Sequence, residues 1–196
     1  MSNKRTQHRS RPTSESGFTL VEMSVAMVLM LIALLALATA IGYAFMVSNK
    51  GRNVTNSKLL IVSILEQMET LRNTKQLRFG QISNTGAVDN SGASQAFGGF
   101  PDDFQPVSLN PGPDGIFGTA DDLIDAGGDG AFGTSDDFQN QALARAGYSR
   151  QIIITNLNPD LKRIQVTLRY PGDKGKMYTQ VGVSYLNNDA RDNYRP

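Results

Sequence analysis

The chain has 196 residues, with 19 Lys and Arg against 18 Asp and Glu, a single His and neither Cys nor Trp. Without Cys it can form no disulfide framework, thiolate nucleophile or zinc finger. His8 lies in a basic polar leader, so no base is available for Ser-His or Cys-His hydrolase chemistry in a folded domain. We therefore do not expect classical hydrolase chemistry.

The net charge of +1 hides segments of opposite sign. Residues 1–17 and 18–78 each carry +3, and residues 145–196 carry +5. Residues 79–144 contain ten Asp and no Lys or Arg. Such an asymmetry predicts that these segments have separate roles.

The basic leader is followed by 25 uncharged residues, Met23–Val47. As a helix this run would be about 37 Å long, enough to cross a hydrocarbon core of ~30 Å with some tilt. The leader predicts a cytoplasmic amino terminus and an exported carboxy-terminal portion. Three interpretations fit: a signal peptide cut after Ala40, a permanent signal anchor, or a segment processed at its cytoplasmic edge. The run is longer than the about 7–15 residues of a signal-peptide core, which disfavours the first.

Glu22 is an ionisable residue at the start of this apolar segment. Placing an ionised side chain within a membrane-spanning segment costs a few kcal/mol of free energy. A residue kept there in spite of this cost is therefore a candidate functional residue. The nearest basic residues, Arg11 and Lys50, are not at helical contact spacing. We therefore expect a cation from another subunit to neutralise Glu22, and a newly formed α-amino group at the start of the same segment would be such a cation.

The hexapeptide Gly17-Phe18-Thr19-Leu20-Val21-Glu22 resembles the amino-terminal signature of type IV prepilins and type II secretion pseudopilins. The resemblance implies that prepilin peptidase cuts between Gly17 and Phe18 and that the new terminal Phe18 is N-methylated. It also implies that Glu22 pairs with the terminal amine of a neighbouring subunit during assembly. Pilins often have a Pro in the spanning segment, but here there is none between Pro12 and Pro101, which favours a minor subunit.

The resemblance implies a structural subunit of a type IV pilus or pseudopilus. Its partners would be prepilin peptidase, other pilin subunits, the inner-membrane assembly machinery and membrane lipid. It would lie in the bacterial inner membrane before assembly and in a periplasmic or cell-surface filament afterwards. Two alternatives remain: a calcium-binding or adhesive surface protein on an uncleaved anchor, and a secreted protein released after Ala40.

The residues after the apolar run keep helical periodicity. Apolar side chains fall on one stripe: Val54, Ile61, Ile64, Leu65, Met68 and Leu71. We expect residues 18–47 to form the assembly half of one long helix and residues 48–79 its amphipathic half. The helix is expected to end near Phe79, with Gly80 as a left-handed cap.

Residues 80–147 are predicted to form a Gly/Asp-rich loop region that contains an internal repeat. Residues 112–122 recur as residues 127–137, with eight of eleven positions identical. Hard oxygen ligands on Gly-rich turns are what Ca²⁺ prefers. Phe117 and Phe132 are expected to pack each turn against the globular part of the chain that follows the apolar helix, which we call the head. The candidate calcium ligands are Asp114, Thr119, Asp121 and Asp122 in the first copy and Asp129, Thr134, Asp136 and Asp137 in the second.

Strict alternation of apolar and polar residues predicts an antiparallel strand at Arg163–Tyr170. Gln151–Thr155 and Met177–Leu186 are predicted as its neighbours in a sheet formed by residues 148–187, followed by a tail at residues 188–196. The basic side chains form no contiguous stripe with stacking aromatics, so nucleic acid is not an expected partner. The predicted fold is α+β and pilin-like: a long amino-terminal helix packed against a small antiparallel sheet, with a Gly/Asp-rich loop insertion.

Overall fold

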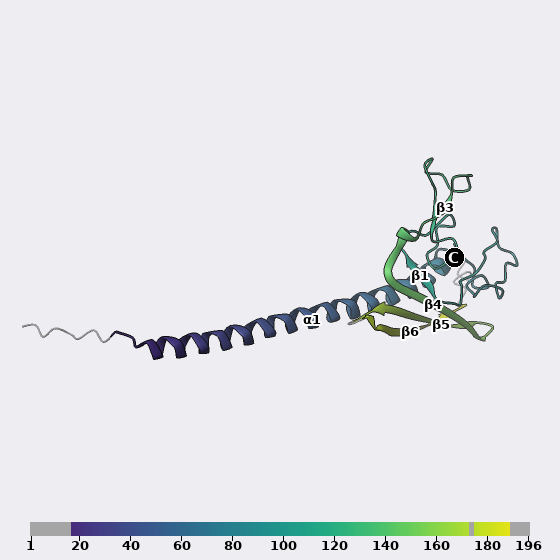
Figure 1. Cartoon of the computed structure of the whole chain (residues 1–196). Coiled ribbons are helices and arrows are strands. Elements are labelled where there is room, and N and C mark those ends of the chain that lie inside the picture. The colour runs from purple at the N-terminus through teal and green to yellow at the C-terminus, as the bar shows by residue number, and fades with distance from the viewer. Residues whose placement is uncertain (1–16, 173–174, 189–196) are drawn as a thin grey trace, which may run out of the picture. The chain divides into compact units, whose positions relative to one another are not determined.

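A computed structural model describes residues 17–172 and 175–188; the predicted leader, residues 1–17, and the predicted tail, residues 188–196, therefore lie almost wholly outside the described residues. The chain divides into two compact units, Met1–Val47 and Ser48–Pro196. One long helix, α1, runs over Leu20–Asn73 (Figure 1). Its apolar part is made of residues with high helix propensity and has no Pro, which would break the backbone hydrogen bonds.

The helix ends earlier than predicted. It stops at Asn73, and Gly80 is not its cap. Lys75 adopts the left-handed conformation with φ 61°, and the Leu77 N–H donates to the Leu71 carbonyl at 3.1 Å. Leu77 is buried, so the chain leaves the helix where an apolar side chain can enter the core.

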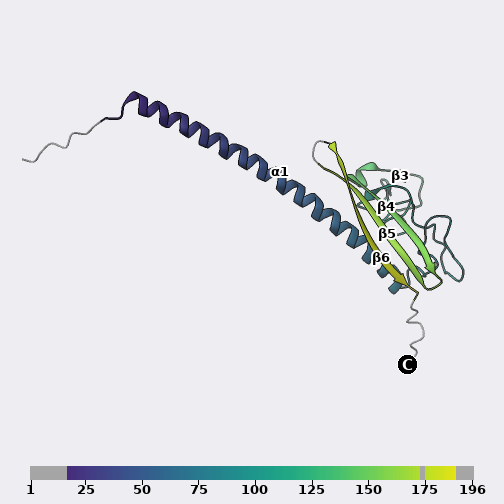
Figure 2. The same ribbon diagram turned by 90° about the horizontal axis from the view of Figure 1, so that it is seen from below.

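The second unit contains a four-stranded antiparallel sheet in the order β1-β4-β5-β6, of which Figure 2 labels β4, β5 and β6. Its strands are β1 at Gln105–Ser108, β4 at Ala144–Asn158, β5 at Leu161–Pro171 and β6 at Met177–Asn187. The three predicted strands are confirmed as the meander β4-β5-β6. The sequence did not predict β1, which follows Pro101 and pairs with β4 through an irregular register.

One face of the sheet packs against the carboxy-terminal turns of α1 (Figure 2). The predicted stripe is confirmed, because Ile61, Ile64, Met68 and Leu71 are buried in one cluster with the inward side chains of β5. Ser57 in the helix donates to Gln180 of β6 at 3.0 Å. The fold is therefore α+β and pilin-like. The alternation of apolar and polar residues along β5 places its apolar side chains on the face of the sheet that packs against α1.

The loop region carries two further short strands, β2 at Ile124–Asp125 and β3 at Phe138–Gln139, and the 3-10 helix η1 at Gln141–Leu143. β2 and β3 pair with each other in a two-stranded antiparallel ribbon. The second copy of the repeat, residues 127–137, forms the tip of this ribbon, and Figure 1 shows the ribbon projecting from the four-stranded sheet.

Candidate functional site

The predicted cleavage site lies just before the helix. Gly17, Phe18 and Thr19 are outside α1 and exposed, and no atom lies within 4 Å of a Cβ placed on Gly17. An exposed peptide bond outside a helix is accessible to a peptidase, so this geometry is compatible with a cut between Gly17 and Phe18. The cut and the methylation of Phe18 stay predictions.

Thr19 and Glu22 form a capping box at the start of α1. The Glu22 carboxylate accepts from the Thr19 N–H and the Thr19 hydroxyl, both at 2.9 Å, and the Glu22 N–H donates to the Thr19 hydroxyl at 3.3 Å. This reciprocal arrangement satisfies backbone donors that the first helical turn leaves free. Glu22 thus has a local partner within its own chain, although that partner is neutral.

The apolar half of α1 has no partner within the described chain. Every residue from Gly17 to Arg52 is exposed, and many of them are large hydrophobic side chains. Among the described residues, α1 is one helix with the length and composition needed to cross a membrane. Such a surface is stable only in lipid or against other protein, because exposed apolar area costs free energy in water.

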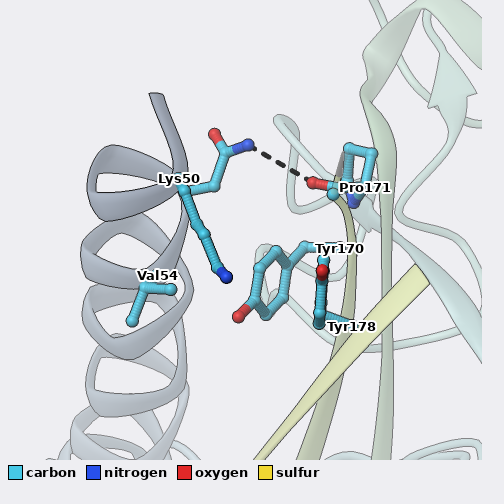
Figure 3. A pocket seen from close by; sticks show the side chains of 7 residues that line it. Lys50, Val54, Tyr170, Pro171 and Tyr178 are labelled. Carbon is cyan, nitrogen blue, oxygen red and sulfur yellow. Dashed lines mark hydrogen bonds between the residues drawn. The ribbon is translucent and has the colours of Figure 1, made fainter. Parts of the chain in front are cut away.

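A small cavity lies between α1 and the sheet in the second unit (Figure 3). Lys50 points toward the ring of Tyr178, whose centroid is 5.8 Å from the ammonium nitrogen, and Tyr178 stacks on Tyr170. Asn53 closes one side by donating to the Pro171 carbonyl at 3.3 Å. The volume of about 30 Å³ is far below that of a small-molecule site, so we assign no ligand to this cavity.

The first copy of the repeat is a compact turn held by its own carboxylates. Asp114 accepts from the Ile116 N–H at 2.7 Å, and Asp121 accepts from the Asp114 N–H at 3.2 Å. Asp122 accepts from the Gly118 N–H at 2.9 Å. The Thr119 hydroxyl, which lies within 3.5 Å of an oxygen of each of the three Asp side chains, links them.

The second copy repeats this geometry position by position. Asp129 accepts from the Ala131 N–H at 2.8 Å, and Asp136 accepts from the Asp129 N–H at 3.3 Å. Asp137 accepts from the Gly133 N–H at 2.7 Å, and the Thr134 hydroxyl donates to Asp136 at 2.6 Å. Sequence identity in the repeat is therefore matched by the same hydrogen-bonding pattern.

The glycines explain why both copies fold alike. Gly112 has a φ of 69° and Gly127 a φ of 67°, a region that favours glycine. A Cβ at either position would lie 2.5 Å from a backbone carbonyl oxygen, that of Asp121 or of Asp136. Both the backbone conformation and the close approach therefore require Gly at the first position of each copy.

The two copies differ in what surrounds them. Arg150 of β4 donates to Asp122 at 2.8 Å, and both side chains are about 96% buried, at 3% and 4% exposure. Ile116 is buried beside them, whereas Phe117, expected to pin the turn, is 41% exposed. The branched Ile side chain enters the core instead, while the Phe117 carbonyl accepts from the Gln67 amide at 2.9 Å.

The second copy has none of these anchors. Ala131 stands where the first copy has Ile116 and is exposed, and Phe132 is 40% exposed. Asp137 occupies the position of Asp122, but no Lys or Arg of residues 17–172 and 175–188 forms an ion pair with it. The second copy is therefore a folded duplicate without the cation that holds the first one.

Each set of predicted calcium ligands lies in one turn, where the carboxylates accept hydrogen bonds from the N–H groups and the Thr hydroxyl of that turn. No group of three or more His, Cys, Asp or Glu side chains within the described segments is placed so that it could hold a metal ion. In the first copy, Asp122 is already paired with a guanidinium. Calcium binding stays a prediction, and in that copy Asp114 and Asp121 form no ion pair with any Lys or Arg that the structure describes.

Burial and neighbouring charge perturb the ionisable groups of the first copy. Burial, together with the nearby carboxylates of Asp121 and Asp122, raises the pKa of Asp114 to about 6. Burial lowers the pKa of Arg150, against the stabilising charge of Asp122. The first copy therefore concentrates negative charge that Arg150 only partly offsets.

Two buried basic residues were missed by the sequence analysis. Arg150 and Lys162 lie on the inward face of their strands, on the same side as Ile152 and Ile164. Lys162 donates to the carbonyls of Phe79 and Ile82 at 2.7 and 2.8 Å, and burial lowers its pKa to about 8. The sequence contains a sign of this burial, because each basic residue lies two positions before an inward-facing Ile, where the alternation would place an apolar side chain.

Comparison with known proteins agrees with the amino-terminal geometry. The family model for the prokaryotic N-terminal methylation motif matches residues 12–38, which include the Gly17–Phe18 bond and Glu22. No curated protein and no solved structure matches the chain. The match, the capping box and the uncovered apolar helix together show that this chain carries the amino-terminal signature of type IV prepilins and pseudopilins.

Proposed function

We propose that the chain is a structural, non-enzymatic subunit of a type IV pilus or a type II secretion-like pseudopilus. Prepilin peptidase would cut it between Gly17 and Phe18 and methylate Phe18. The subunit would wait in the bacterial inner membrane, surrounded by lipid. The assembly machinery would then draw it into a periplasmic or cell-surface filament.

The observation that supports this proposal most is the uncovered apolar half of α1, directly after the methylation motif. In the membrane, lipid covers this surface. In a polymer, the same surface is covered by equivalent helices of other subunits. Contacts between different patches on successive copies generate an open helical filament rather than a closed ring.

Glu22 supplies the step that fixes the register of such a polymer. Its carboxylate is held by the neutral Thr19 within one chain. The amine that cleavage creates on Phe18 of a neighbouring subunit would offer it a positive charge instead. A charged partner in an apolar surrounding stabilises a carboxylate more strongly than a neutral one does.

The test is the Glu22→Ala variant of the full chain, expressed in cells that assemble the filament. We expect a processed, stable membrane protein whose incorporation into sheared filaments falls at least tenfold. Glu66→Ala, which removes an exposed carboxylate from the same helix, is the matched control and should leave incorporation unchanged. Normal incorporation of Glu22→Ala would refute the assembly role.

The alternatives are separated by the amino terminus of the mature protein. A chain that starts at methylated Phe18 supports the proposal. An intact leader supports a surface protein on an uncleaved anchor, and a chain that starts at Ile41 supports a secreted protein. Mass spectrometry of the purified full-length product reports all three.

Calcium binding by the Asp repeats is a separate proposal about the head. The favouring observation is that the Thr119 hydroxyl lies near three carboxylates of the first copy, of which Arg150 pairs with Asp122 alone. We expect the detergent-solubilised full chain to melt at a higher temperature in millimolar Ca²⁺ than in chelator, and Asp121→Asn to reduce that difference. Equal melting temperatures with no bound metal would reject the proposal.

A further inference from the structure

The two copies of the repeat fold into the same hydrogen-bonded turn but differ in the residues that surround the turn. In the first copy, the carboxylate at the eleventh position, Asp122, holds a guanidinium at 2.8 Å inside the head. In the second copy, Asp137 has the same backbone partner but no cation among the described residues. The first copy thus shows one cation that can pair with this position of the repeat, an arginine side chain on a β-strand.

The second copy is placed where another molecule can reach it. It lies at the tip of the β2-β3 ribbon, and its residues 128–136 are all exposed (Figure 1). Phe132 is 40% exposed and Phe138, just beyond it, is 52% exposed. The tip therefore combines carboxylates with apolar rings, and residues 79–144 hold no Lys or Arg that could neutralise it.

A surface of complementary character lies on the same chain. One face of the sheet meets α1, and the opposite face carries Val181, Val183 and Tyr185 of β6 at 54%, 41% and 60% exposure. Arg163 of β5 is paired in register with Tyr185 on this outer face. Among the described residues, none of the outward-facing side chains of β4, β5 and β6 is acidic, so the outer face is apolar with positive charge.

Arg163 is available for a further interaction. One of its terminal nitrogens donates to Gln165 at 2.8 Å, and the side chain is only half-buried. The other guanidine of this face, Arg169, already lies 3.5 Å over the ring of Phe104. Arg163 therefore is the better match to Arg150, which also extends from a strand of this sheet.

We propose that the second repeat, residues 127–137, docks on the outer sheet face of a second copy of this chain, where Arg163 pairs with Asp137 as Arg150 pairs with Asp122. Phe132 would cover Val183 and Tyr185 of that copy. The contact joins two different patches, so it propagates from copy to copy. It rests on the proposed polymer as the source of neighbouring copies.

The test uses cysteine cross-linking in the full chain, because the natural sequence has no Cys. The variant with Ser135→Cys in the second repeat and Val183→Cys on the sheet is treated with a short bis-maleimide in membranes and in sheared filaments. The matched control is Ala120→Cys with Val183→Cys, since Ala120 holds the same exposed position in the first repeat.

We expect a ladder of multimers from the Ser135 variant and at least fivefold less product from the Ala120 control. Adding Arg163→Glu or Asp137→Asn should lower the product about fivefold, as should high salt, because the pair is partly exposed. Equal products from the two Cys pairs, or no ladder at all, would overturn the docking.

Filament yield is measured on the same samples without cross-linker. Filaments without the ladder reject the docking and leave the proposed function intact. A lack of filaments from both the variant and the natural sequence rejects the proposed function, and the membrane samples then decide the docking by themselves.

Discussion

Replacing Asp122 by Asn tests how the first repeat is anchored. The substitution keeps an acceptor oxygen for the Gly118 N–H but removes the charge that faces Arg150. Arg150 would then be a buried guanidinium without a counter-charge. Breaking a buried ion pair by removing one partner costs about 3–5 kcal/mol.

The structure places the expected loss near the lower end of that range, about 3 kcal/mol. The reason is that the second terminal nitrogen of Arg150, Nη1, is buried and has no hydrogen-bond partner among the described residues, so the native pair is incompletely satisfied. The matched substitution in the second copy, Asp137→Asn, breaks no ion pair among the described residues. It should cost less than about 0.5 kcal/mol, as surface substitutions usually do.

The assay is urea unfolding of the detergent-solubilised full chain, followed by tyrosine fluorescence because the chain has no Trp. A lower midpoint with an unchanged slope reports a loss of stability. Adding Arg150→Met to Asp122→Asn should recover much of the loss, because no buried charge then lacks a partner. The reasoning is refuted if Asp122→Asn and Asp137→Asn differ by less than about 1 kcal/mol.

Two further predictions concern packing and charge. Gly182→Ala should destabilise the head by about 1–3 kcal/mol, because a Cβ there would lie 2.2 Å from the γ2-methyl of the buried Ile61. Gly51→Ala is the control: it lies in open space on α1 and should stabilise the protein slightly, because Ala has the higher helix propensity. Asp114→Asn should raise the melting temperature above pH about 6 and leave it unchanged below pH about 4. The pKa of Asp114 is raised from 3.8 to about 6, so the loss of stability caused by its charge develops between these two pH values and is complete above pH about 6; a constant difference across pH would contradict this.

Much of the fold follows from periodicity along the chain. The stripe from Ile61 to Leu71 and the alternation from Arg163 to Tyr170 identify the helix face and the strand face that meet, because each pattern has the period of its own element. The end of α1 was predicted wrongly, since a non-Gly residue, Lys75, takes the left-handed conformation that Gly80 was expected to supply. That choice depends on where Leu77 can be buried.

The candidate sites likewise combine features that are local in sequence with contacts that depend on the tertiary structure. The hexapeptide that ends at Glu22 is a local signal, and the methylation motif, the membrane-spanning length and the repeat can all be read from the order of the residues. Tertiary structure alone decided that Arg150 lies beside Asp122 and that no described cation lies beside Asp137, because residues distant in sequence meet only when the strands pair. Two nearly identical segments thus acquired different surroundings: one is part of the core, and the other is an exposed duplicate whose Asp137 has no ion pair with any described residue.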